Sequence, residues 1–129
     1  MAESRGVRLS LGGEPAFTLG SRGDLRRAVI NLAANAVEHT PVGGNVELRT
    51  ATGARFAEVV VSDDGFGVDE TTRASLFQRF ANGASAGSGT GLGLYIVRRI
   101  AEETGGGVRY EPREPRGSVF VLTLPKARA

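Results

Sequence analysis

Residues 24–41, DLRRAVINLAANAVEHTP, constrain the fold most, because their apolar side chains recur every three or four positions. This spacing predicts a helix that packs one side on a core. Ser21 followed by Asp24 is typical of a capping box at the start of such a helix. Thr40 and Pro41 are expected to end it, because the residue before a proline is disfavoured in helical conformation.

Two asparagines, Asn31 and Asn35, lie inside the predicted helix, one turn apart and therefore on the same side. Asparagine is a poor residue for the middle of a helix, because its amide competes for backbone hydrogen bonds. The pair therefore suggests a polar surface that binds a ligand. Solvation or local hydrogen bonding of both side chains explains the pattern equally well at this point.

The composition indicates one soluble domain covering residues 1–129. No apolar run approaches the ~20 residues of a membrane span, and no secretory signal pattern is present, so a cytoplasmic location is expected. Cysteine is absent and His39 is the only histidine, which excludes thiolate and multi-histidine metal sites. The net charge of +2 comes from interspersed acids and bases, which does not favour nucleic-acid binding.

The remaining elements follow from alternation and turn signals. We expect a first hairpin of residues 7–11 and 16–19 through Gly12–Pro15, strands at 45–51 and 56–62, and a helix at 74–80. A second core helix opens after the glycines at 89–93 and ends at Gly105, and a last hairpin joins 108–111 to 119–124. Val59–Val61 is expected to be buried on both faces. This order predicts an α/β two-layer sandwich, with a mixed, mainly antiparallel sheet of about five strands covered on one face by about three helices.

A glycine-rich turn precedes the second core helix: Gly89, Thr90, Gly91, Leu92 and Gly93. Such turns bind phosphates, because glycines admit close approach and free N–H groups face the anion. A Walker A loop is excluded, since the only lysine is Lys126, and the spacing does not fit a Rossmann fingerprint. The protein-kinase lysine and H-R-D loop are also absent. A flexible connector remains the alternative for this turn alone.

Asp63 ends a predicted buried strand and is followed by Gly65 and Gly67. A carboxylate in this position can accept a hydrogen bond from an amino group in a pocket. Turn formation alone is the alternative, since Asp-Asp-Gly is favourable turn chemistry.

Taken in order, N-L-x-x-N-A with H-T-P, then D-x-G-x-G, then G-T-G-L-G-L resembles the ATP-binding domain of bacterial sensor histidine kinases. That family shares a superfamily with gyrase, heat-shock chaperone and mismatch-repair ATPases. Residues 31–41 resemble its N box, 63–67 and 89–94 its two glycine boxes, and Phe77 and Phe80 its phenylalanine motif. The likeness covers nearly the whole chain, to the closing residues 117–120.

The resemblance implies that Asn35 ligates the Mg²⁺ that bridges the ATP phosphates and that Asn31 supports this site. It implies that Asp63 binds the exocyclic amine of adenine, while Gly65 and Gly67 allow close approach. The glycine turn at 89–93 would wrap the phosphates, and His39 and Ser118 would lie among the nucleotide-binding residues. Residues from about 68 to 88 would form the ATP lid.

By the same resemblance, the reaction is transfer of the γ-phosphoryl group to a histidine on a separate helical dimerisation and phosphoacceptor domain, with a response regulator downstream. In the relatives that activate water, and in the serine kinases that act on anti-sigma partners, a glutamate that serves as general base stands at the position of Asn31. Because an amide takes no proton near neutral pH, slow intrinsic ATP hydrolysis is expected. The alternatives are a regulatory nucleotide-binding module without transfer and an anti-sigma-type serine kinase. The isolated domain is expected to be monomeric.

Some positions depart from the family pattern. Glu38 stands where many relatives have a basic residue, and we expect it to face solvent or a partner. Phe66 and Asp64 replace a frequent proline and asparagine, and Arg79 is only a weak candidate for a phosphate contact. His39 lacks the surroundings of a phosphoacceptor histidine, so packing or hydrogen bonding near the nucleotide mouth is its expected role.

Overall fold

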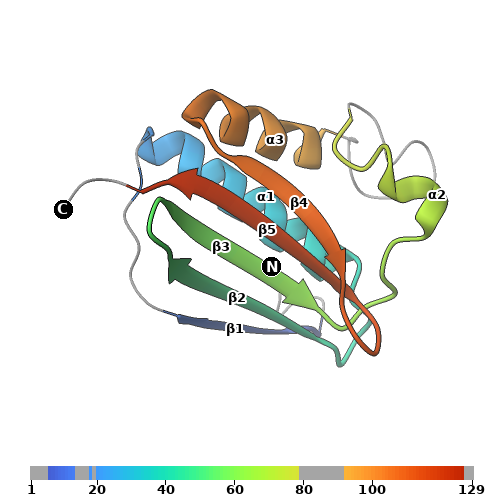
Figure 1. Ribbon diagram of the computed structural model, residues 1–129. Helices are drawn as coiled ribbons and strands as arrows, with labels where there is room; N and C mark the ends of the chain where they lie inside the picture. Colours follow the sequence, from blue (N-terminus) through green and yellow to red (C-terminus); the bar gives the residue numbers. More distant parts are fainter. Residues whose placement is uncertain (1–5, 14–17, 19, 79–91, 127–129) are drawn as a thin grey trace.

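The computed structural model describes residues 6–13, 18, 20–78 and 92–126. A sheet forms one layer and the helices lie on one of its faces (Figure 1). The elements, in chain order, are β1 (Arg8–Gly13), α1 (Arg22–Glu38), β2 (Asn45–Thr52), β3 (Phe56–Asp63), α2 (Glu70–Arg73), α3 (Gly93–Thr104), β4 (Gly107–Pro112) and β5 (Ser118–Pro125).

The sheet has five strands in the order β1-β2-β3-β5-β4. β1 runs parallel to β2, and the other neighbouring pairs are antiparallel. The predicted mixed, mainly antiparallel sheet with helices on one face is therefore confirmed. None of the helices within the described ranges is long and apolar enough to cross a membrane.

The predicted first hairpin is wrong. Gly12 and Gly13 extend β1 along Arg49 and Thr50 of β2 instead of forming a turn. Thr18 makes an isolated antiparallel bridge with Lys126, so it does not return along β1. The glycines suggested a local turn, whereas the strand's partner is more than thirty residues away in the sequence. Residues 14–17 and 19 of this prediction lie outside the described residues.

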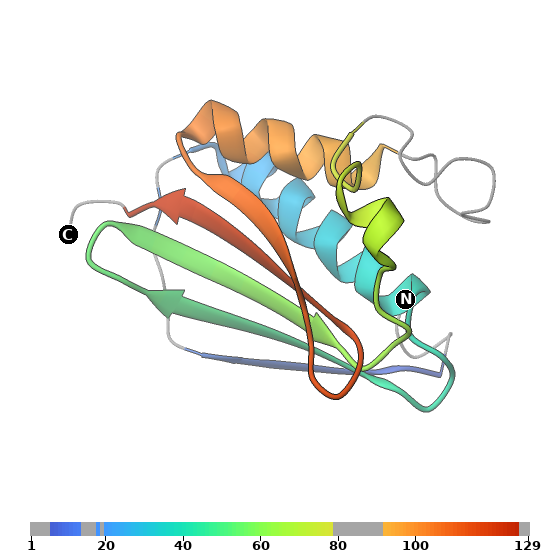
Figure 2. The same ribbon diagram turned by 45° about the vertical axis from the view of Figure 1, so that its right-hand side comes forward.

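α1 begins where the capping pattern indicated. The Ser21 hydroxyl oxygen accepts a hydrogen bond from the backbone N–H of Asp24 at 3.0 Å, which satisfies one free donor of the first turn. Its buried face packs on the sheet and on α3, and Figures 1 and 2 show the two helices side by side over the strands. The buried residues of α1 are Ala28, Leu32, Ala33, Ala36 and Val37.

α3 confirms the predicted second core helix, with Val97, Ile100 and Ala101 buried. It ends at Gly105, whose φ of 97° lies in the left-handed region that glycine adopts without steric cost. The Gly105 N–H bonds the Glu102 carbonyl and the Gly106 N–H bonds that of Ala101. This is the pairing of a Schellman motif, and it satisfies carbonyls that the helix end leaves free.

Two further expectations need correction. Val61 is buried, but Val59 and Val60 are only partly buried. Val60 faces the side opposite to Val61, because successive strand residues alternate, and no helix in the described part of the chain covers that face of the sheet (Figure 2). Val59 faces the same side as Val61 and packs against the core while staying partly exposed. The helix expected at 74–80 begins earlier, as α2, because the Asp69 side chain caps it by accepting from Thr72 N at 2.9 Å. Residues 74–77 form turns, and Phe80 lies outside the described residues.

Candidate functional site

Asp63, the last residue of β3, is a buried carboxylate with 2% of its surface exposed. It pairs across the sheet with Val46 and Ser118, both buried on the helix-covered face. The Gly65 N–H donates to Asp63 Oδ1 at 2.9 Å. Burial raises the pKa of Asp63, although the N–H groups of Gly65 and Ser118 and the nearby His39 counteract part of this rise. The side chain is thus held by backbone donors, facing the helical layer.

Gly65 is buried against the end of α1. A Cβ on Gly65 would overlap the carbonyl oxygen of His39, so only glycine fits there without displacement of the backbone. Gly67 adopts a φ of 77°, and a Cβ there would come within 3.3 Å of the Gly117 carbonyl oxygen. Both glycines were expected to permit close approach, and the approach that the structure describes is by the protein's own backbone.

Asn31 and Asn35 lie on α1, and both are partly exposed. The Asn31 side-chain amide lies 3.5 Å from the carbonyl oxygen of Gly93, the first residue of α3. The side chain of Asn35 makes no hydrogen bond with any residue in the described ranges. Asn35 therefore presents an amide oxygen that is available to a ligand, one helical turn from a contact that reaches α3.

His39 connects the asparagine helix to the Asp63 turn. Its backbone N–H and ring Nδ1 lie 3.2 and 2.7 Å from the Asn35 carbonyl oxygen. Since a carbonyl only accepts, Nδ1 carries the proton, and in the neutral ring Nε2 is an acceptor. His39 is exposed, in keeping with the hydrogen-bonding role expected of it near the mouth of the site, and Glu38 is exposed as expected.

The glycine turn is described only at its end. Leu92 precedes α3, and its side chain forms no capping bond. A Cβ on Gly93 would meet nothing within 4 Å among the groups that the structure describes. Gly89, Thr90 and Gly91 lie outside the described residues, as do Arg79 and residues 79–88 of the expected lid.

The segment that follows the Asp63 turn is fixed by an aromatic cluster, of which the sequence motifs predict only Phe77. Phe77 packs edge-on against Phe120 with ring centroids 6.0 Å apart, and Tyr110 does so at 5.4 Å. The Tyr110 hydroxyl accepts from Val68 N at 3.2 Å, and the Arg73 guanidinium lies 5.4 Å from the Tyr110 ring centroid. Phe77 was predicted, but Tyr110 and Arg73 had no local signal.

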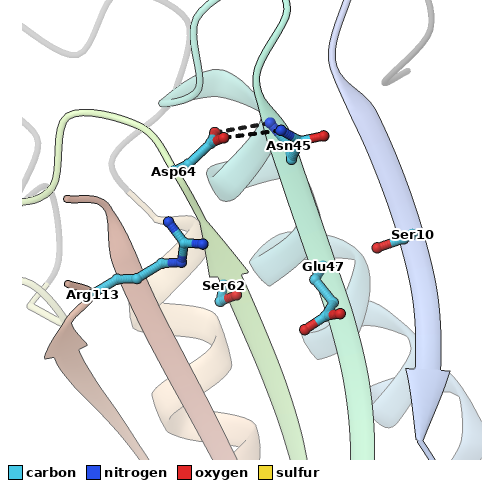
Figure 3. Close-up of a pocket in the computed structure, with 6 residues that line it drawn as sticks. All are labelled: Ser10, Asn45, Glu47, Ser62, Asp64 and Arg113. Atoms are coloured by element: carbon cyan, nitrogen blue, oxygen red, sulfur yellow. Dashed lines mark hydrogen bonds between the residues drawn. The ribbon is translucent and has the colours of Figure 1, made fainter. Parts of the chain in front are cut away.

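A polar cluster lies on the face of the sheet that the helices do not cover, and no sequence motif predicted it. Figure 3 shows a pocket there, with the Asp64 carboxylate paired to Asn45 and Arg113 close by. In the sequence, Asp64 stands out only as a replacement for an asparagine that is frequent in the family. Neighbouring residues at the end of β3 thus serve opposite faces of the sheet. The pocket residues are Ser10, Asn45, Glu47, Ser62, Asp64 and Arg113.

The described residues contain no group of three or more histidines, cysteines or carboxylates that could hold a metal ion. A cation at the α1 surface would therefore take amide and ligand oxygens. Such oxygen donors fit a hard ion such as Mg²⁺, which keeps much of its coordination shell for phosphates and water.

The chain belongs to the family of histidine kinase-, DNA gyrase B- and HSP90-like ATPases, whose pattern matches residues 20–128. Within that family it is similar to sensor histidine kinases. It is 42% identical over 113 residues to the signal transduction histidine-protein kinase/phosphatase MprB of Mycobacterium sp. (strain KMS), covering 82% of this chain and 22% of that protein. It is 36% identical over 130 residues to the sensor protein kinase PmrB of Pseudomonas aeruginosa, covering 98% and 27%.

Solved structures agree. A mycobacterial sensor histidine kinase MprB structure superposes with a TM-score of 0.86 at 32% identity, covering 98% of this chain and 89% of that one. Full-length ShkA in complex with AMPPNP superposes with a TM-score of 0.85 at 30% identity, covering 99% and 27%. The predicted family and fold class are therefore confirmed. The chain spans about a quarter of the length of these two curated relatives, MprB and PmrB.

Proposed function

We propose that this chain binds Mg·ATP between α1, the Asp63–Gly67 turn and the start of α3, and that it is the phosphoryl-donating domain of a sensor histidine kinase. The observation that carries the proposal is the convergence of these three elements. Asn31 reaches the first residue of α3, and His39 joins the Asn35 turn of α1 to Gly65. Family membership and the AMPPNP-bound neighbour support the choice of nucleotide.

Asp63 recognises adenine in this proposal. Its carboxylate is buried and held by backbone N–H groups, so its oxygens are oriented before a ligand arrives. It accepts a hydrogen bond from the exocyclic amine of adenine. A guanine ring in the same pose would present a carbonyl oxygen to the carboxylate, and two acceptors repel each other. ATP is therefore selected over GTP.

Asn35 supplies the side-chain oxygen for Mg²⁺, since its amide makes no hydrogen bond to a described residue and amide oxygen suits this cation. Asn31 supports that position from one turn away. When bound, Mg²⁺ neutralises charge on the phosphates. The phosphates lie at the N-terminal end of α3, with Leu92 and Gly93, because the dipole of a helix favours an anion at this end, and Gly89, Thr90 and Gly91 complete this contact. His39 and Ser118 border the nucleotide.

The acceptor is a histidine on a separate helical dimerisation domain. Its imidazole nitrogen forms the new bond to the γ-phosphorus while the bond to the bridging oxygen breaks and ADP leaves. Because imidazole is nucleophilic when neutral, this domain needs no general base, and the amide of Asn31 provides none. The product phosphohistidine then serves as phosphoryl donor to a response regulator.

The domain spans residues 1–129, its lid spans about 68–88, and it functions in the cytoplasm, where ATP is available.

Calorimetry tests the nucleotide site. Titration of the chain with Mg·ATP gives saturable heat, and Asn35→Ala or Asp63→Asn weakens binding at least about tenfold, the loss of a charge-assisted contact. The Asn35 variant loses affinity for Mg·ATP but not for ATP in EDTA. Absence of heat with all three proteins contradicts the proposal and indicates an interaction domain that binds no nucleotide.

Transfer is tested separately, with the helical domain of the same kinase supplied and γ-labelled ATP. The expected product is an acid-labile, base-stable phosphohistidine on that domain. Nucleotide binding without any label identifies a regulatory module, and acid-stable phosphoserine identifies a serine kinase.

A further inference from the structure

The turn after β3 is held by contacts that lie outside the proposed nucleotide site, on the face of the sheet that the helices do not cover. Asp64 Oδ1 accepts from the Asn45 backbone N–H at 2.8 Å, and Oδ2 accepts from the Asn45 side-chain amide at 3.0 Å (Figure 3). These two hydrogen bonds lower the pKa of Asp64. Asp64 N also donates to the Asn45 carbonyl oxygen at 3.2 Å. β2 therefore holds both the side chain and the backbone of Asp64.

The loop between β4 and β5 holds the same residue from the other side. Arg116 Nε donates to the carbonyl oxygen of Asp64 at 3.0 Å, across 52 positions of sequence. Arg113 stabilises the loop with two hydrogen bonds. Its guanidinium donates to the Arg116 carbonyl oxygen at 3.2 Å, and its backbone N–H donates to the Gly117 carbonyl oxygen at 3.2 Å. Gly117 is itself buried against the Asp63 carbonyl, where a Cβ would overlap that oxygen.

The contact made by Arg116 acts on one particular peptide unit. The carbonyl of Asp64 and the N–H of Gly65 belong to the same planar peptide, and that N–H donates to Asp63 Oδ1 at 2.9 Å. The peptide is thus bonded at both ends, to a guanidinium on its oxygen and to a carboxylate on its hydrogen. A hydrogen bond to the oxygen fixes the plane and strengthens the bond made by the N–H.

We propose that Arg116 is a positioning residue for adenine recognition: it holds the 64–65 peptide in the orientation that aims the Asp63 carboxylate. The inference rests on the proposed ATP site and names a residue that none of the nucleotide motifs contains. Arg116 is exposed, so its replacement should leave the core intact, and its loss acts on the ligand through Asp63.

The test compares Mg·ATP with the Mg²⁺ complex of purine riboside triphosphate, which carries hydrogen in place of the exocyclic amine. In Arg116→Ala we expect the affinity for ATP to fall about three- to tenfold, the effect of one hydrogen bond, and the affinity for the analogue to stay unchanged. The ratio of the two dissociation constants isolates the coupling between Arg116 and the amine. Arg116→Lys, which keeps a cationic donor, restores part of the ratio.

Arg109→Ala is the matched control. Arg109 is also exposed, and its Nε bonds Glu111 at 2.7 Å within β4, away from the turn, so both affinities should be unchanged. Equal losses for ATP and the analogue in Arg116→Ala, or no loss for either, overturn the inference while leaving the ATP site intact. Failure of the wild-type chain to bind ATP overturns the proposed function itself, which is a distinguishable result.

Discussion

The carbonyl oxygen of His39 occupies the space that a side chain on Gly65 would need. This contact joins the last turn of α1 to the turn that follows β3. It fixes the separation between the helix that bears Asn35 and the strand that ends in Asp63. The requirement for glycine at this position therefore concerns the distance between two walls of the proposed site.

Gly65→Ala should weaken Mg·ATP binding at least about tenfold and lower the free energy of unfolding by about 1–3 kcal/mol, because the overlap forces the two backbones apart. Calorimetry and urea denaturation measure the two effects. Gly23→Ala is the control: it lies in the first turn of α1 with nothing within 4 Å of the added Cβ, and it should leave affinity unchanged. Wild-type affinity in Gly65→Ala would show that the two walls do not need this spacing.

Burial raises the pKa of Asp63 above its ordinary value of 3.8, and this shift makes stability depend on pH. The folded protein binds the proton at higher pH than the unfolded chain does. The contribution of Asp63 to stability is therefore fully present below about pH 3.8 and is lost as pH rises through the folded pKa.

Asp63→Asn removes the pH dependence of stability that Asp63 causes, and its amide oxygen can still accept the hydrogen bond from the Gly65 N–H. The variant should be more stable than wild type at pH 7, and the difference should shrink as pH falls toward 3.8. Thermal melts of both proteins between pH 3.5 and 8 measure this difference, and ATP binding by the variant should be at least about tenfold weaker. A gap between the two proteins that does not vary with pH would contradict the assignment of a raised pKa to Asp63.

Asn31→Glu should increase intrinsic hydrolysis of ATP, which we expect to be slow in the wild-type chain. A carboxylate beside Asn35 can accept a proton from water, which an amide cannot, and general bases contribute ~10²–10⁴-fold when well placed. We expect a rise of at least about tenfold in phosphate release, limited by imperfect placement. Asn31→Gln controls for side-chain length and should give no rise. Equal rates in wild type and both variants would mean that residue 31 does not face the attacking water.

Gly105→Ala should lower the free energy of unfolding and leave the affinity for Mg·ATP unchanged. Its φ of 97° costs an L-residue about 1–2 kcal/mol, and the Schellman bonds at the end of α3 depend on that conformation. Urea denaturation should show the loss, with Mg·ATP affinity unchanged at temperatures where the variant is folded. A loss of affinity in the folded variant would instead place the end of α3 in communication with its beginning.

The helices could be predicted from the sequence because their signals are local. Ser21 caps α1 through the residue three positions on, and Gly105 ends α3 through carbonyls three to five positions back. The cap at Asp69 is a local signal too, and it starts α2 at Glu70, earlier than the expected residue 74. The prediction of a hairpin at β1 was wrong for a different reason. The parallel partner of β1 is distant in the sequence, and Gly12 and Gly13 are equally compatible with a turn and with a strand edge.

The same distinction applies to the candidate site. Asn31, Asp63 and Gly93 belong to short motifs, and the Asn31 side-chain amide lies 3.5 Å from the Gly93 carbonyl oxygen. Asp64, Asn45 and Arg116 were not found, because each contact joins segments 19 or 52 positions apart and none has a spacing that sequence periodicity detects. Contacts of this kind follow from strand register and are visible only once the sheet is assembled.

The alternation at the end of β3 ties recognition to strand register. Asp63 faces the helices, while Asp64 serves the opposite side of the sheet. A shift of β3 by a single position against β2 and β5 would exchange the two carboxylates and turn the proposed adenine contact outward into solvent. Length changes within β3 are thus forbidden by ligand chemistry as well as by packing, so natural variation in this domain should accumulate by substitution there and by insertion only in the loops.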